Sequence, residues 1–234
     1  DCIDILDEHP VHFTPQEFVD TLSPITPRLY SISSSPKSHP REVHLTVAIV
    51  KYNNFERDRF GLATGNLFNR VEINKTKIPV YIQSTKEFVI PEDSSKDVIM
   101  IGPGTGIAPF RAFLEQRIED NGTGRNWLFF GEVHEKSTFF YKDEWFEAMK
   151  NGHLQKLTTA FSRDQEHKIY VQHRLLGNSK EIWKWLQSGS YFYVCGDKQY
   201  MAKDVHSALI EIAQKEGKFK KEDAENYINQ TLMK

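Results

Sequence analysis

The stretch DVIMIGPGTGIAPFRAF, residues 97–113, joins an apolar run to three glycines and then to a helical pattern. Such a run is typical of a strand covered on both faces of a parallel sheet. Gly102, Gly104 and Gly106 let the backbone approach a phosphate closely, and the amino end of the following helix offers unpaired N–H groups. The spacing differs from G-x-G-x-x-G, so the usual dinucleotide fingerprint is not matched. The stretch nevertheless favours nucleotide binding over a plain turn.

Strand and helix patterns alternate from here to the end of the chain. Further strand-like runs are NWLFFGE (126–132), LQKLTTAFS (154–162) and YFYVCGD (191–197). Helical patterns occupy residues 107–119, 139–150, 172–187, 199–217 and 220–234. Alternation at this spacing predicts an α/β doubly wound parallel sheet.

The first ninety residues have a different pattern. Runs rich in β-branched and aromatic residues predict antiparallel strands at 28–33, 42–52 and 78–83. Short helices are expected at 14–22, where a Thr cap precedes a Pro, and in GLATGNLFNRV, 61–71. This half therefore predicts a small antiparallel β-barrel. We expect two domains, 1–93 and 94–234, with the boundary in IPEDSSKD.

The composition excludes several classes of protein. Of the 234 residues, 39% are hydrophobic and 26% charged, as in an ordinary globular protein, and the net charge of −2 argues against nucleic-acid binding. No apolar run approaches the roughly 20 residues that span a bilayer. Cys2 and Cys195 lie far apart, so we expect no disulfide framework, no metal site and a reducing, cytoplasmic setting. Because the chain lacks an initiator Met and a signal-peptide pattern, it is expected to be processed or part of a longer protein.

The loop after the run at 154–162 carries a second set of polar residues. Arg163 offers a planar fork and Lys168 a point charge for a phosphate, and Tyr170 can stack on a base. Taken alone, the loop is slightly better explained as a solvated charged segment. Together with the glycine turn it indicates a ligand with an additional phosphate, which NADPH has and NADH lacks.

Two further features suggest chemistry. Cys195 ends a strand-like run, where a cysteine is usually a small core residue but would here face a reaction centre. In RLYSISSSP, Arg28 can pair with a phosphate, Tyr30 can lie flat on a large ring and Ser31 can hydrogen-bond a ring nitrogen. The GLATG turn offers backbone N–H groups for a second phosphate contact.

These motifs occur together in a recognisable order. RLYSISSS, HLTVAIVKY, GLAT, IGPGTGIAPFRAF, WLFFG, SRDQEHKIYVQ and YVCGD…MAKDV extend over essentially the whole chain. The chain resembles the ferredoxin–NADP reductase-type module of NADPH-dependent diflavin reductases, and within them the flavoprotein α-component of sulfite reductases. The resemblance implies an antiparallel FAD-binding barrel, incomplete at its N-terminal side, followed by an α/β NADP(H)-binding domain.

The resemblance also implies roles for individual residues. Ser31 and Cys195 would be catalytic, beside the flavin N5 and the nicotinamide C4. The residues implied for FAD are Arg28, Leu29, Tyr30, Ser31, Thr46, Val47, Ala48, Tyr52, Gly61, Leu62, Ala63 and Thr64. The residues implied for NADPH are Thr105, Ser162, Arg163, Lys168, Ile169, Tyr170, Val171, Gln172 and Asp204.

The implied activity is hydride transfer from NADPH to FAD. Electrons would continue through FMN, in an upstream flavodoxin-like domain outside this chain, to a haemoprotein subunit that reduces sulfite to sulfide. No nucleic-acid or membrane partner is expected. Three alternatives remain open: another diflavin reductase, a single-flavin ferredoxin or flavodoxin reductase, and a fragment that binds nucleotide without turnover.

Overall fold

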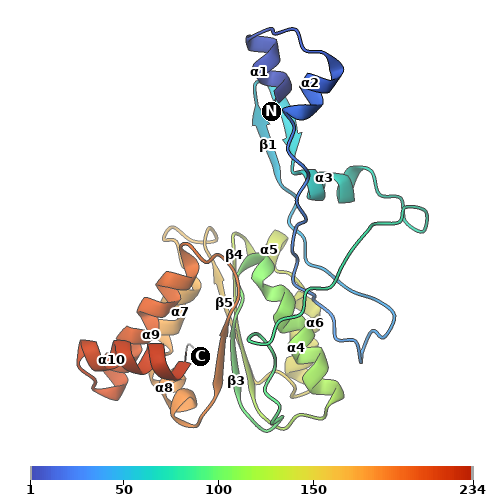
Figure 1. Cartoon of the computed structure of the whole chain (residues 1–234). Helices are drawn as coiled ribbons and strands as arrows, with labels where there is room; N and C mark the ends of the chain where they lie inside the picture. The colour runs from blue at the N-terminus through green and yellow to red at the C-terminus, as the bar shows by residue number, and fades with distance from the viewer. Residues whose placement is uncertain (1, 233–234) are drawn as a thin grey trace. The chain divides into compact units, whose positions relative to one another are not determined.

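The computed structural model describes residues 2–232 and divides into two compact units (Figure 1). The first unit contains the chain up to Tyr30 together with Val47–Val80. The second contains Ser31–Thr46 and the chain from Tyr81 onward. None of the described helices combines the length and the apolar content that a membrane crossing needs.

A four-stranded parallel sheet forms the centre of the second unit. Its strands are β3 (Val98–Ile101), β4 (Asn126–Glu132), β5 (Lys156–Phe161) and β6 (Tyr191–Val194), in the order β5-β4-β3-β6. The predicted parallel sheet is thus confirmed. Since β4 and β5 extend the sheet on one side of β3 and β6 on the other, the strand order reverses at β3. The carboxyl ends of β3 and β6 therefore flank a crevice of the kind in which open α/β sheets bind ligands.

The helices of the second unit cover both faces of this sheet (Figure 1). Side chains alternate along β3, so that Ile99 and Ile101 face α7 to α10 while Val98 and Met100 face α4 and α6. The helices are α4 (Ala108–Glu119), α5 (Glu135–Thr138), α6 (Lys142–Lys150), α7 (Val171–Gly177), α8 (Ser179–Gln187), α9 (Met201–Gly217) and α10 (Lys221–Tyr227). Shorter turns are the 3₁₀ turn η1 (Gly104–Ile107) and the π-helical turn η2 (Ile228–Leu232).

Aromatic side chains on β4 pack the sheet against α8. Trp127 stacks on Phe129 with ring centroids 4.9 Å apart and lies 5.3 Å from Trp185 of α8. Its indole N–H donates to Thr158 Oγ1 at 3.0 Å, so its polar atom is satisfied inside the core. Burying each large side chain contributes about 2–3 kcal/mol. The strand ends that form the crevice thus project from a rigid support.

The helix predicted over 172–187 is in fact two helices, α7 and α8, so that prediction is wrong in extent. The break falls at Gly177 and Asn178. The Asn178 side-chain amide donates to the carbonyl of Arg174 at 2.8 Å, which occupies an acceptor near the end of α7. Asparagine after glycine favours such local bonding over continuation of a helix.

The first unit consists of small elements. They are α1 (Cys2–Glu8), α2 (Pro15–Asp20), the hairpin strands β1 (Lys51–Asn54) and β2 (Arg57–Phe60), and α3 (Leu62–Asn69). The helix predicted after Thr14 is confirmed as α2, and Thr14 and Glu17 form a capping box. Phe55 and Glu56 turn the hairpin with φ of 51° and 56°, the sign that a two-residue type I′ turn requires.

Two predicted strands do not form, and the third, predicted over 42–52, is a strand only at Lys51 and Tyr52, the start of β1. Residues 78–83 have no strand partner, and residues 28–33 contribute only one isolated bridge, Ile32 to Leu45. Val80, in the first unit, and Ile82, in the second, are 83% and 75% exposed, so neither side chain is part of a core. Among the described residues the β1–β2 hairpin is the sole antiparallel sheet, and the closed barrel stays a prediction.

Candidate active site

The glycine turn after β3 packs directly against the end of β6. A Cβ built on Gly106 would lie 2.1 Å from the carbonyl oxygen of Cys195, so no side chain fits between the two backbones. Gly104 has a φ of +57°, which favours glycine. The chain then passes through η1 into α4, whose first turn supplies the positive end of a helix dipole. The turn thus has the form of a phosphate cradle.

Ser31 and Cys195, the two residues expected to be catalytic, both belong to the second unit. Burial raises the pKa of the Cys195 thiol, and the nearby Ser31 hydroxyl opposes that effect without reversing it. The thiol is therefore neutral at pH 7. The Cys195 backbone N–H donates to Ile101 O at 2.9 Å, so the residue continues the β3–β6 ladder beyond the strands.

A pocket of about 530 Å³ opens at the carboxyl edge of the sheet. It is lined from the glycine turn, the ends of β4 and β5, and the starts of α7 and α9. Five residues expected for NADPH are among its walls: Ser162, Tyr170, Val171, Gln172 and Asp204. Sequence positions spread over 43 residues are thereby gathered in one cavity because parallel strands end at the same edge.

A hydrogen bond links two of these walls. The Gln172 side-chain amide donates to Asp204 Oδ2 at 2.9 Å, joining the first turn of α7 to the first turn of α9. Tyr170 precedes α7, its backbone N–H donating to His173 Nδ1 at 3.0 Å. The first bond holds the first turns of α7 and α9 together at the pocket, and the second orders the start of α7.

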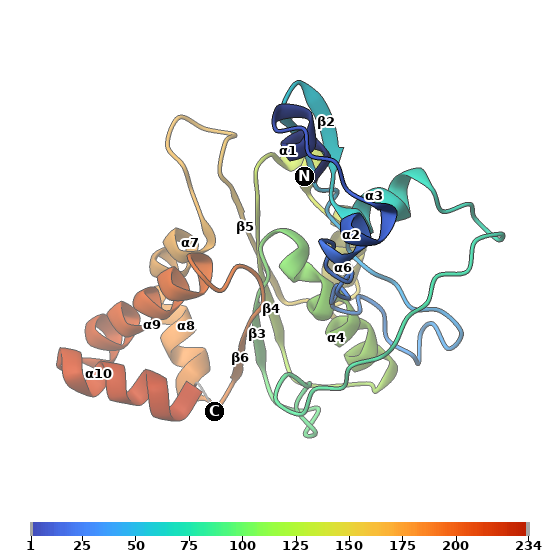
Figure 2. The same ribbon diagram turned by 45° about the horizontal axis from the view of Figure 1, so that its top comes forward.

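The remaining residues expected for NADPH lie outside the pocket walls. Thr105, Arg163 and Lys168 are exposed, and Ile169 packs against the core beneath α7. The segment that carries Arg163 and Lys168 connects β5 to α7 and extends past the end of the sheet (Figure 2). Both cations thus stand where a ligand that projects from the pocket can reach them.

The base of this segment is held by acidic and backbone contacts. The Arg163 backbone N–H donates to Val133 O at 3.0 Å. Asp164 accepts from the Glu135 backbone N–H and pairs with His134 Nδ1, both at 2.8 Å. These bonds lower the pKa of Asp164, the bond from Glu135 most. The loop is therefore fixed at its start while the side chains of Arg163 and Lys168 remain free to bind.

The residues expected for FAD are divided between the two units. Ser31 and Thr46 belong to the second, where Thr46 Oγ1 lies 2.7 Å from the Tyr141 hydroxyl. The members in the first unit are Arg28, Leu29, Tyr30, Val47, Ala48, Tyr52, Gly61, Leu62, Ala63 and Thr64. Val50 accepts from the Gly61 N–H at 2.9 Å and donates to Thr64 Oγ1 at 3.2 Å, which ties the GLAT turn to the segment after Ala48.

Sequence reasoning missed several pocket residues. Glu132, Asp197, Tyr200 and Met201 all line the cavity, and Asp197 accepts the Tyr200 backbone N–H at 2.6 Å. Glu132 ends β4, and Asp197 closely follows β6. Ligands of open α/β sheets bind beyond the carboxyl ends of the strands. This rule pointed to Ser162, and it applies equally to Glu132 and Asp197.

Comparisons with known proteins agree with this geometry. The family model described as an FAD binding domain matches residues 1–65, and the one described as an oxidoreductase NAD-binding domain matches residues 100–207. The second range contains the glycine turn, the pocket and Cys195. The chain therefore carries an FAD-binding domain followed by an NAD-binding domain of the oxidoreductase type.

Curated relatives extend the similarity to nearly the whole chain. The "Sulfite reductase [NADPH] flavoprotein alpha-component" of Mannheimia succiniciproducens is 48% identical over 97% of this chain, and that of Bacillus subtilis 44% identical over 97%. The chain spans 38% of the length of either relative. The glycine turn, the pocket and both family matches agree with this identity. The chain therefore belongs to the family of the sulfite reductase [NADPH] flavoprotein alpha-components, as a ferredoxin–NADP reductase-type module.

Proposed function

We propose that this chain is an NADPH-dependent flavin reductase module, in which a hydride passes from NADPH to FAD beside Ser31 and Cys195. One observation carries the proposal. The pocket that gathers five residues expected for NADPH opens at the same strand ends where the glycine turn meets the Ser31–Cys195 pair.

The residues present suit NADPH. A cavity of about 530 Å³ is in the range of small-molecule and cofactor sites. Its walls include Glu132, Asp197 and Asp204, whose carboxylates would repel phosphates. The phosphates therefore belong at the N–H groups of the glycine turn and at Arg163 and Lys168 outside the walls, with the uncharged rings inside.

The residues in the first unit suit FAD. Leu62 to Thr64 form the first turn of α3, whose N–H groups have no acceptor within the helix and are a suitable partner for a pyrophosphate. Arg28 is exposed, and its guanidinium donates a hydrogen bond to Thr26 O at 2.6 Å. A phosphate can take the place of that acceptor. We infer that residues 1–93 form the FAD side, in an antiparallel barrel, and residues 94–234 the NADP(H) side.

When bound, FAD supplies the ring that accepts a hydride from NADPH. The protein's part is to position and enclose the two rings. Cys195 stays a neutral thiol and packs, partly buried, against the core cluster on the α4 side of the sheet. The Ser31 hydroxyl would hydrogen-bond a ring nitrogen of the bound flavin. The close backbone contact at Gly106 fixes the position of Cys195 relative to the glycine turn.

We propose the wider electron path from the relatives. Their names describe NADPH-dependent sulfite reductase flavoproteins. The electrons leaving FAD would pass to FMN in a flavodoxin-like domain and then to a haemoprotein subunit that reduces sulfite to sulfide. The cytoplasm, where NADPH is available and cysteines stay reduced, is the proposed location.

A steady-state assay tests the proposed module. The purified chain is incubated with FAD, freed of excess flavin and assayed with a dye as electron acceptor, using NADPH or NADH as donor. The proposal predicts a yellow protein that reduces the dye with a clear preference for NADPH. A protein that stays colourless, or a dye rate equal to that of free FAD, contradicts it.

A further inference from the structure

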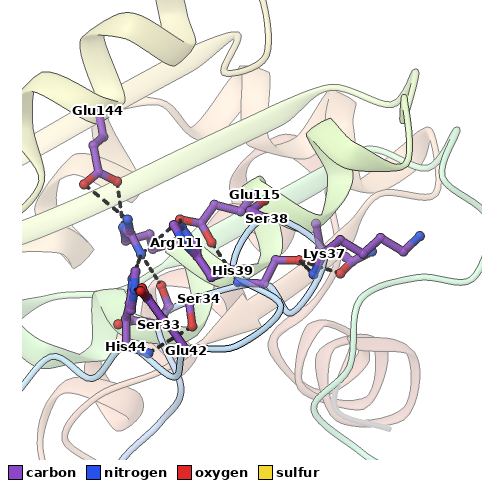
Figure 3. A network of polar contacts seen from close by, with 12 residues as sticks. Ser33, Ser34, Lys37, Ser38, His39, Glu42, His44, Arg111, Glu115 and Glu144 are labelled. Carbon is purple, nitrogen blue, oxygen red and sulfur yellow. Dashed lines mark hydrogen bonds and ion pairs between the residues drawn. The ribbon is translucent and has the colours of Figure 1, made fainter.

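Three potential metal ligands meet in the segment Ser31–Thr46, in the second unit. One donor atom from each of His39, Glu42 and His44 lies within 4.8 Å of the others. Figure 3 shows the three side chains beside Arg111 and Glu115 of α4. We propose that His39, Glu42 and His44 form a binding site for Zn²⁺. The prediction of no metal site came from the two cysteines alone and did not include these histidines.

The donor set is the first argument for zinc. Two imidazoles and one carboxylate are a ligand combination that zinc uses, whereas Mg²⁺ and Ca²⁺ take oxygen ligands. His44 Nε2 and Glu42 Oε2 are already 2.8 Å apart, and the two histidine rings have centroids 4.2 Å apart. The side chains of His39 and His44 are 31% and 32% exposed, so small rotamer changes can bring the donors to zinc-bond length.

Glu115 offers a fourth ligand. Its Oε1 lies 3.4 Å from His39 Nε2, and its Oε2 accepts the Ser35 backbone N–H at 2.7 Å. The side chain is 17% exposed. Glu115 lies outside the three-residue group, so its carboxylate would turn toward the histidines to take the fourth position of a tetrahedral site.

The local charge balance is the second argument. Ion pairs around the two histidines join Glu42 to His44, and Glu115 and Glu144 to Arg111. The guanidinium of an arginine is always charged. The histidines aside, these three carboxylates and one guanidinium leave two excess negative charges, which a divalent cation balances.

Arg111 remains satisfied when zinc binds. Its Nη1 donates to Ser33 O at 2.7 Å, lies 2.9 Å from Glu115 Oε1 and lies 3.2 Å from His44 Nδ1. Zinc on His44 Nε2 would place the ring hydrogen on Nδ1 and end that contact. The Ser33 bond and the bidentate pairing with Glu144 persist.

The site would fasten the segment Ser31–Thr46 to α4. The segment begins at Ser31, so zinc would restrain the hydroxyl near Cys195. This consequence, unlike the binding itself, rests on the proposed function.

Zinc titration of the whole chain, stripped of metal with EDTA, tests the site. Isothermal calorimetry without FAD or NADPH should give one zinc per chain and no heat with Mg²⁺. His39→Ala should weaken zinc binding at least tenfold and leave both cysteines in place. The matched control His153→Ala removes an exposed histidine outside the cluster and should bind as the wild type does. Co²⁺ should show the absorption of a four-coordinate site in the wild type, and His39→Ala should lose it.

A second variant separates the loss of a zinc ligand from misfolding of the chain. Glu42→Gln keeps the shape of an exposed side chain and should also weaken zinc binding at least tenfold, with an unchanged circular dichroism spectrum. Equal zinc affinity in the wild type, His39→Ala and Glu42→Gln would overturn the proposal, as would the absence of stoichiometric binding. Because no flavin or nucleotide is present, a failed reductase assay does not affect this result.

Discussion

Gly106→Ala tests the contact on which the site depends. The added Cβ would lie 2.1 Å from the Cys195 carbonyl oxygen and 2.7 Å from its carbonyl carbon, whereas such contacts are essentially never shorter than 3.0 Å. Both neighbours are backbone atoms and cannot swing aside, so the glycine turn and the β6 end must separate by about 1 Å. Overpacking of this kind costs about 1–3 kcal/mol of folding free energy. A displacement of about 1 Å at reacting groups lowers a rate by up to about 100-fold.

The assay pairs urea unfolding with the rate of NADPH-dependent flavin reduction. Gly177→Ala is the matched control, because a Cβ on Gly177, the last residue of α7, meets nothing within 4 Å. The control should keep the wild-type rate and gain up to about 1 kcal/mol of stability. If Gly106→Ala matches the wild type in both stability and rate, the contact between the glycine turn and Cys195 does not position the reacting groups.

Three further predictions concern single side chains. Arg163→Ala should raise KM for NADPH by at least tenfold and leave KM for NADH nearly unchanged, because only NADPH carries the additional phosphate; equal increases would remove Arg163 from the phosphate site. Cys195→Ala should slow flavin reduction in stopped flow with little change in NADP⁺ affinity, and an unchanged rate would mean that the thiol does not face the rings. Burial alone would raise the pKa of Asp97, but the bonds from Arg125, two from its guanidinium to Oδ2 and one from its backbone N–H to Oδ1, outweigh it and lower that pKa. The carboxylate therefore stabilises the fold above its unfolded pKa of about 3.8, and this contribution disappears as the pH falls through the lower folded pKa. Asp97→Asn should lose about 1–2 kcal/mol at pH 7 and depend less on pH below 4, as followed by urea unfolding; an acid profile identical to that of the wild type would contradict the pairing.

The parallel sheet could be predicted because its signals are local. Residues 98–101 and 126–131 are mostly apolar and buried on both faces, and each is followed by a turn and a helix. The β-barrel depended on signals that are not local. Residues 78–83 have a strand-like composition, yet a strand forms only where a partner pairs with it, and composition does not specify the partner.

The residues of the candidate site likewise differ in whether a local signal in the sequence marks them. Ser162 and Gln172 could be found from a charged loop after a strand, and Cys195 from the end of another. The His39, Glu42 and His44 group escaped notice because its meaning depends on α4, about 70 residues further along the chain, which supplies Arg111 and Glu115. A spacing of polar residues gains chemical meaning only when folding brings the neighbouring charges to it.

Anaerobic single-turnover reduction of the FAD-loaded chain by NADPH tests hydride transfer at the Ser31–Cys195 site. Stopped-flow absorbance follows the flavin band after mixing with equal concentrations of NADPH or NADH. We expect NADPH to bleach the band in one turnover, NADH to do so far more slowly, and Ser31→Ala to slow the NADPH reaction. A flavin band unchanged by NADPH, in a chain that has bound FAD, would contradict hydride transfer at the Ser31–Cys195 site.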